Sequence, residues 1–256
     1  MKIGINLTTF NRLEFSEQCL KSLLWSKPQE TVISIVDNGS TDGTKEMILD
    51  YQNTYPSIKH VVLNKENLYI GAAIRQGWSL LSEDCPLLCC INNDYLMEPG
   101  WDINARACFD EMGIDYLVGS IRFDIEHKKQ ITPSGNGHYV LTKDAGAGYF
   151  IKREHFLNGY YPSTRPFSAK YVGPGPSWHK RLKRNLIGFR LASPGVVVRK
   201  SEYNKPEYVE YYNKTFGIRA RQAQLVRFRQ LEDSTRPRGW MNWQEFLQKH
   251  YPEKVK

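Results

Sequence analysis

The sequence has no long hydrophobic run and no leader-like segment at its start. No apolar stretch approaches the roughly 20 residues that a membrane-spanning helix needs, and Met1 leads directly into a strand-like segment. These absences predict a soluble, cytoplasmic protein, and peripheral attachment to a membrane stays open.

Cysteine is scarce, and its spacing does not suggest a metal site. The five cysteines include no Cys-x-x-Cys pair and no Cys/His ligand spacing. Cys89 and Cys90 are adjacent, so on a strand they would face opposite sides of a sheet and pack as small apolar residues. A structural zinc site is not indicated, and a reducing compartment fits best.

Acidic residues are in the minority. The 256 residues include 35 Lys and Arg against 27 Asp and Glu, which gives a formal net charge of +8. Excess positive charge attracts anionic partners such as an acidic glycan, a phospholipid, a nucleotide or a nucleic acid. The basic run 179–184 is equally consistent with a solvated helix face. No nucleic-acid reader motif occurs, so a specific nucleic-acid partner is not expected.

Strand-like and helix-like segments alternate through the first half of the chain. Apolar or β-branched runs predict strands, and apolar residues at helical spacing predict helices between them. The predicted strands are 2–7, 31–36, 59–63 and 87–91, and the predicted helices are 13–25, 44–55 and 70–81. This alternation indicates an α/β fold with a mostly parallel, Rossmann-like sheet and helices on both faces.

The second half is less regular. Strands are expected at 116–122 and 149–152 and within 189–199, a loop or hairpin at 126–138, a mobile loop at 160–176 and a helix at 178–186. The tail is predicted to be helical, basic and aromatic. Its Trp240 and Trp243 suggest a docking surface for an anionic acceptor, a partner or a membrane. We therefore expect a catalytic domain at 1–200, with halves 1–100 and 101–200, and a helical C-terminal extension at 201–256.

Polar clusters follow four of the predicted strands directly. They are Thr8–Arg12, Asp37–Thr41, Asn64–Asn67 and Asn92–Asp94. Ligands of parallel α/β sheets bind beyond the carboxyl ends of the strands, so these clusters predict one shared site.

Asp94 is the strongest candidate in that site. A carboxylate at a strand end suits a hard divalent cation, Mg²⁺ or Mn²⁺, that neutralises a nucleotide diphosphate. The alternative for Asn-Asn-Asp is ordinary turn chemistry. Asp37 has two interpretations as well, since it could accept the N–H of a nucleotide base or build a turn. Asp42 is expected to cap the following helix. In the third cluster, Gly71 permits close approach, and Arg75 could reach a phosphate or a base.

These segments together resemble the family 2 glycosyltransferases of the GT-A fold. The matching stretches are Thr8–Arg12, Ile35–Thr44, Asn67–Arg75 and Cys90–Asp94, in the family's order and approximate spacing. The resemblance is strong over 1–100 and weak over 115–200. It implies inverting transfer of a sugar from a nucleotide-diphosphate sugar, with a UDP-sugar favoured, to the hydroxyl of a glycan, lipid-linked or protein acceptor.

The resemblance also implies residue roles. Asp94 would bind the metal in the family's Asp-x-Asp segment, where this chain has asparagines in place of the earlier acids. The residues implied in donor binding are Thr8, Phe10, Arg12, Asp37, Asn67, Gly71, Arg75, Asn92 and Asn93.

The sequence departs from the family at the catalytic base. The expected Glu-Asp pair would fall near 173–179, where the chain reads Gly-Pro-Gly-Pro-Ser-Trp-His. His179 is one candidate base, because imidazole titrates near neutrality. Asp144 is the competing candidate. A catalytically inactive nucleotide-sugar-binding protein is therefore the alternative function. A dinucleotide oxidoreductase is disfavoured, since no Gly-rich turn follows the first strand.

Overall fold

The structure is a computed structural model of the 256-residue chain. It describes residues 1–118 except 27 and 82, residues 148–160 and residues 243–255. It also describes the short segments 130–131, 139–140 and 196–197 and the single residues 134 and 210. All structural statements below concern these residues.

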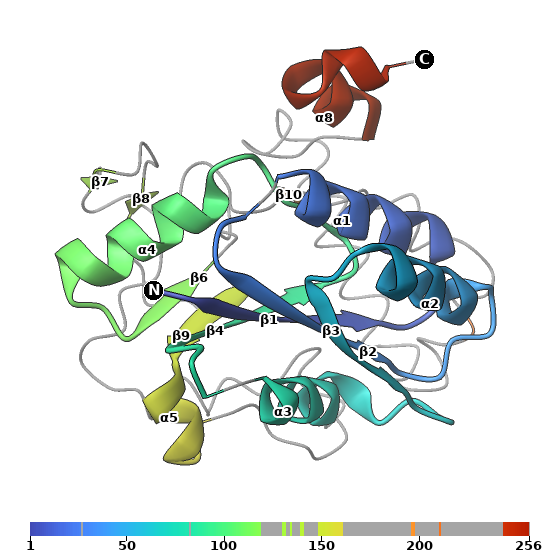
Figure 1. The fold of residues 1–256 in the computed structure, drawn as a ribbon, viewed down its shortest axis with the longest axis horizontal. Coiled ribbons are helices and arrows are strands. Elements are labelled where there is room, and N and C mark those ends of the chain that lie inside the picture. Colours follow the sequence, from blue (N-terminus) through green and yellow to red (C-terminus); the bar gives the residue numbers. More distant parts are fainter. Residues whose placement is uncertain are drawn as a thin grey trace.

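A six-stranded sheet forms the centre of the molecule (Figure 1). Its strand order is β3-β2-β1-β4-β9-β6, in which β1 to β4 pair in parallel and β9 runs antiparallel to both of its neighbours. The strand bounds are β1 Ile3–Thr9, β2 Thr31–Asp37, β3 Ile58–Leu63, β4 Leu87–Asn92, β6 Tyr116–Val118 and β9 Tyr149–Lys152. The predicted mostly parallel sheet is confirmed.

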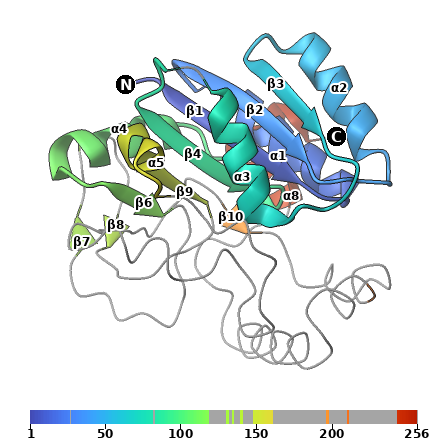
Figure 2. The same ribbon diagram turned by 90° about the horizontal axis from the view of Figure 1, so that it is seen from below.

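Helices cover both faces of this sheet (Figures 1 and 2). On one face the apolar cluster includes Leu20, Ile48 and Phe109, and on the other it includes Ile74 and Trp78. The first face carries α1 Leu13–Trp25, α2 Thr44–Thr54 and α4 Trp101–Met112, and the second carries α3 Tyr69–Leu80 and α5 Arg153–Leu157. Two separate cores therefore form on the two faces of one sheet.

Alternation along the strands divides residues between the two cores. Cys89 packs in the first core and its neighbour Cys90 in the second, as their adjacency predicted. All five cysteines are buried thiols that form no disulfide. Burial raises the pKa of the Cys19 thiol to about 12, so this thiol is protonated and unreactive at neutral pH.

The helix α3 lies close to β1 because a glycine faces a buried amide. A Cβ added to Gly77 would lie 1.8 Å from Oδ1 of Asn6. Asn6 is fully buried, and its amide accepts a hydrogen bond from the Ser34 hydroxyl (3.2 Å). Gly77, near the C-terminal end of α3, thus lets the helix pack closely against the sheet, which is the structural role that small residues usually have in a helix.

The predicted elements of the first half are all present, with bounds shifted by a residue or two at most. Two helices, α4 and α5, were not predicted. In the second half, β7 Gln130–Ile131 and β8 Tyr139–Val140 pair as an antiparallel hairpin, and β10 Val196–Val197 lies within the predicted final strand and pairs with β5 Tyr95–Leu96. The predicted loop 160–176, apart from Tyr160, and the predicted helix 178–186 lie outside the described residues.

The tail contributes helix α8 Trp243–His250, followed by the short 3₁₀ helix η3 Pro252–Lys254. Within the described part of the chain, no helix combines the length and the apolar character required to cross a bilayer.

Candidate active site

The parallel register brings three strand ends to one level. Thr8 in β1 pairs with Val36 on one side and with Asn92 on the other, and Thr9 pairs with Asp37. The loops that follow β1, β2 and β4 therefore start side by side at the carboxyl edge of the sheet. This is the convergence that the sequence predicted.

Asp37 is fully buried and organises the loop after β2. Its Oδ1 accepts hydrogen bonds from the backbone N–H groups of Gly39 (3.1 Å) and Ser40 (2.9 Å). Its Oδ2 accepts from the hydroxyls of Thr9 (2.9 Å) and Ser40. Four donors match the acceptor capacity of one carboxylate. Asp37 therefore builds the loop, and its contact with a base stays a prediction.

The loop after β1 adopts an unusual backbone. Asn11 and Arg12 both have positive φ, 51° and 64°, which costs free energy for residues other than glycine. Neighbouring loops hold this turn in place: the Asn11 N–H donates to Oγ of Ser40 (2.7 Å), and Oδ1 of Asn11 accepts from the Thr41 N–H (2.8 Å). Arg12 then serves as the N-cap residue of α1.

Asn93 points into the protein. It is 8 % exposed, and its amide nitrogen donates to the backbone oxygen of Asn11 (3.1 Å) and to Oγ of Ser16 (2.9 Å). These bonds tie the segment after β4 to the loop after β1. Asn93 thus holds two loops of the site together, and a direct role in donor binding stays a prediction.

Asp94 lies in the turn between β4 and β5, next to a cation from the first loop. Its Oδ2 is 3.4 Å from Nη1 of Arg12, and the two side chains are 13 % and 7 % exposed. The Arg12 guanidinium carbon also lies 4.8 Å from the centroid of the Phe15 ring. Asp94 therefore lies in a turn and forms an ion pair, and its role as a metal ligand stays a prediction.

Asp42 joins two helices at the same edge. Its Oδ1 accepts from the N–H of Thr44, the first residue of α2 (3.2 Å), although Gly43 occupies the N-cap position. Its Oδ2 accepts from the Leu13 N–H at the start of α1 (2.9 Å). Both helix N-termini thereby lie beside the loop that carries Asp37. Sequence reasoning had assigned Asp42 to one helix only.

The other residues predicted to bind the nucleotide-sugar donor lie around this edge and differ in how far they are buried. Thr8 and Gly71 are buried, while Arg75 on α3 is exposed. Oδ1 of Asn67 accepts from the N–H of Tyr69 (2.8 Å), which also has a positive φ. Phe10 and Asn92 are partly exposed. The predicted catalytic candidates His179 and Asp144 lie outside the described residues.

The C-terminal segment packs near the strand that follows Asp94. Phe246 is fully buried against Leu96. Glu98 accepts from Nζ of Lys249 (3.1 Å) and lies 3.3 Å from Nε2 of His250. Trp243, predicted as part of a docking surface, lies 5.7 Å from the ring of Trp25. It is therefore engaged within the molecule.

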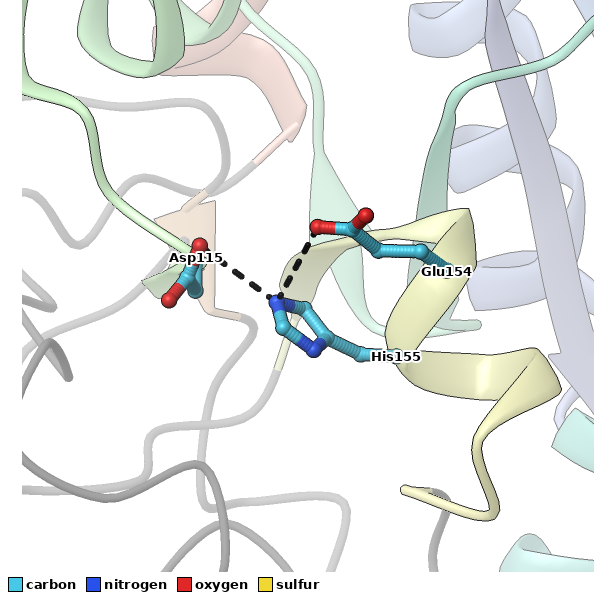
Figure 3. A group of neighbouring side chains, drawn as sticks. All are labelled: Asp115, Glu154 and His155. Atoms are coloured by element: carbon cyan, nitrogen blue, oxygen red, sulfur yellow. Dashed lines mark ion pairs between the residues drawn. The ribbon is translucent and has the colours of Figure 1, made fainter.

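A second charged cluster lies at the opposite edge of the sheet (Figure 3). Asp115, Glu154 and His155 bring ligand atoms within 4.8 Å of one another, a spacing that could hold a metal ion. His155 Nε2 is 3.4 Å from Asp115 Oδ1, and Lys152 Nζ is 2.9 Å from the same oxygen. Lys152 pairs with Leu87, the first residue of β4, so the cluster lies roughly 17 Å from the Asn92 end. It is remote from Asp94.

Among the described residues, the carboxyl edge thus brings the Asp94 carboxylate together with a buried cation, Arg12. Mg²⁺ and Mn²⁺ bind through oxygen ligands, and Mg²⁺ is commonly held by one or two carboxylates together with substrate phosphates and water. Asp94 fits this role, whereas Asn93 is occupied inside the protein. The arrangement suits a site for a metal and a diphosphate.

Comparison with known proteins agrees with this geometry. A family model described as glycosyl transferase family 2 matches residues 5–175. No curated protein sequence matches the chain.

Several solved structures share the fold. S. aureus TarS, residues 1–349, has a TM-score of 0.56 at 16% identity, over 75% of this chain and 58% of that one. The mannosyltransferase PcManGT from Pyrobaculum calidifontis, in complex with GDP-Man and Mn2+, has a TM-score of 0.60 at 15% identity, over 91% and 65%. TarS 1–349 in complex with UDP has a TM-score of 0.51 at 18% identity, over 66% and 52%. The chain spans less than two thirds of each.

Proposed function

The chain belongs to glycosyltransferase family 2, and from that premise we propose that it transfers a sugar from a nucleotide-diphosphate sugar to an acceptor hydroxyl, with inversion and with the help of a divalent cation. One observation carries the proposal. The strand register places Asp94, Arg12 and the Asp37 loop together at the carboxyl edge of a parallel sheet. A diphosphate bound there would meet both a metal-ligating carboxylate and a cation.

Asp94 would hold the cation, and phosphate oxygens and water would complete its coordination. When bound, Mn²⁺ or Mg²⁺ would neutralise charge that develops on the departing diphosphate. Asp94 is the single carboxylate proposed as a ligand, because Asp37 is saturated by the donors of its own loop. Metal affinity should therefore depend strongly on the nucleotide, which supplies the remaining ligands.

The donor is proposed to be a UDP-sugar. The UDP complex of TarS supports this choice, and the GDP-Man complex of PcManGT is the reason to test guanosine donors beside it. Thr8, Phe10 and Asn67 would surround the base and ribose, and Arg75 on α3 would reach a phosphate or the base. The acceptor is proposed to be a glycan, a lipid-linked sugar or a protein.

Inversion requires a base that removes the proton of the attacking hydroxyl. His179 and Asp144 remain the proposed alternatives for this role. A substitution at each, His179→Ala and Asp144→Asn, would identify the base as the one whose loss lowers kcat and leaves donor binding intact.

A thermal-shift screen tests the proposal. UDP-, GDP- and dTDP-sugars are added with and without Mn²⁺, and each donor that raises Tm is then assayed for transfer and for hydrolysis. We expect a UDP-sugar to raise Tm more with Mn²⁺ than without it. Binding without transfer or hydrolysis would favour the alternative, a catalytically inactive nucleotide-sugar-binding protein. The absence of a shift with every donor would contradict both.

A further inference from the structure

Arg12 has a backbone conformation that costs free energy, and it lies next to Asp94, the only carboxylate proposed to bind metal. Two successive non-glycine residues in the left-handed region, Asn11 and Arg12, are uncommon and cost free energy. Bonds from Ser40, Thr41 and Asn93 hold the turn in that form. A turn supported by two other loops of the site points to a function for the side chain that it presents.

The guanidinium of Arg12 is held against apolar surface as well as against Asp94. It lies over the ring of Phe15 at 4.8 Å, close enough for a cation–π contact. The side chain is 7 % exposed, so its charge is poorly screened by water. A buried cation of this kind requires a negative partner, and Asp94 is one such partner.

The pair is nevertheless loose. The distance between Nη1 of Arg12 and Oδ2 of Asp94 is 3.4 Å, whereas a strong charge-assisted hydrogen bond is about 2.8 Å long. A single contact at this distance orients the guanidinium toward the carboxylate without a bidentate lock. Arg12 can therefore leave Asp94 at small cost when a better anion arrives.

A divalent cation and Arg12 compete for the same carboxylate. Two positive groups beside one Asp94 repel each other in a poorly solvated site. A diphosphate removes the conflict, because its oxygens accept the guanidinium while Asp94 receives the metal. The cation and the diphosphate should then bind better together than either does alone.

We propose that Arg12 is the resident counter-ion of Asp94, which it exchanges for the donor diphosphate when a divalent cation binds. The inference rests on the proposed function, because it assigns Asp94 to a metal and Arg12 to a diphosphate. It also predicts how the two ligands bind: Arg12 opposes binding of the free metal ion and favours binding of the metal together with the nucleotide. Arg12 thus couples two ligands that share one carboxylate.

The test measures Mn²⁺ binding by loss of the free-ion electron paramagnetic resonance signal, with and without UDP. The variants are Arg12→Gln, which removes the charge, Arg12→Lys, which keeps it, and Asp94→Asn, which removes the carboxylate. Without UDP, Arg12→Gln should bind Mn²⁺ tighter than the wild type, on the order of tenfold. Arg12→Lys should stay near the wild type, and Asp94→Asn should lose binding.

The second part of the test repeats the Mn²⁺ measurement in the presence of UDP. The gain in Mn²⁺ affinity that UDP produces should be smaller in Arg12→Gln than in the wild type, and UDP binding without metal should weaken in the same variant. Unchanged or weaker Mn²⁺ binding by Arg12→Gln would overturn the inference, as would Mn²⁺ binding that survives Asp94→Asn or is undetectable in every protein. If UDP alone bound to none of the proteins, that result would instead count against the proposed function. The measurement with Mn²⁺ alone tests Arg12 and Asp94 independently of UDP.

Discussion

The two edges of the central sheet each carry an aspartate beside a cation, and the two pairs are built differently. At the amino edge, Oδ1 of Asp115 is 2.9 Å from Nζ of Lys152 and 3.4 Å from Nε2 of His155. At the carboxyl edge, Oδ2 of Asp94 has one contact with Arg12, at 3.4 Å. The first carboxylate is compensated by close neighbours on β9 and α5. The second is buried to a similar degree but is held loosely.

We interpret this difference as one between a structural ion pair, at Asp115, and the pair at Asp94 to which we assign a function in the proposal above. Lys152 and His155 belong to adjoining elements, β9 and α5, so their side-chain nitrogens reach Asp115 without a left-handed backbone at either residue. Arg12 reaches Asp94 only through two left-handed residues that three bonds from other loops support. At Asp94, a buried carboxylate has a single long contact with its counter-ion, and the backbone of that counter-ion is strained. These three features do not occur together at Asp115.

The largest expected effect comes from neutralising each aspartate in turn. Asp94→Asn should lower the rate of sugar transfer roughly 100- to 1000-fold, because charge on the leaving diphosphate loses its stabilisation. Asp115→Asn, the matched control, should change the rate less than about twofold, since it lies at the far edge. Both rates are measured with the same donor and Mn²⁺. An equal loss in the two variants would remove the distinction between the edges.

Stability should show a smaller contrast. Asp37→Ala should lower the free energy of unfolding by about 3 kcal/mol, because buried N–H and O–H donors at Gly39, Ser40 and Thr9 lose their acceptor. Asp115→Ala should cost at most about 1 kcal/mol, because Lys152 can turn to water. Urea denaturation of both variants measures this. A larger loss at Asp115 would mean that its cluster is a structural centre.

The smallest effect concerns a third charged group, at the C-terminal helix. Burial lowers the pKa of His250 below its ordinary value of 6.5, Glu98 opposes that shift, and Lys249 adds to it. The unfolded chain therefore binds the proton more tightly, so the stabilisation present above pH 6.5 should decline as the pH falls below it. Fluorescence of Trp25 and Trp243 against pH should report a looser α8 in acid. His250→Gln should flatten that profile, and a steep profile in this variant would contradict the assignment.

Much of the fold could be predicted from the sequence, because periodicity and strand-end chemistry are local signals. The helix over 13–25 and the strand over 149–152 were placed to the residue. The missed helix α4 does carry a signal, since Trp101, Ala105, Cys108 and Phe109 recur at helical spacing and are buried. Alanine and cysteine make that apolar stripe inconspicuous.

The contacts of the site could be predicted only in part. Strand ends identified Asp37 and Asp94, but a left-handed backbone at Asn11 and Arg12 cannot be inferred from an Asn-Arg dipeptide. The ion pair between Arg12 and Asp94 joins residues that are 82 positions apart in the sequence, and so does the hydrogen bond from Asn93 to Asn11. Such pairs depend on the register of three strands, which composition and spacing do not encode.

The contact of Trp25 with the C-terminal segment has a consequence for biosynthesis. Trp25 ends α1 and is covered by Trp243, Tyr251 and Lys254. A ribosome that adds 5 to 20 residues per second would need roughly ten to forty seconds to make the chain between Trp25 and its cover. Until synthesis passes residue 254, the nascent chain lacks residues that cover this indole in the folded protein.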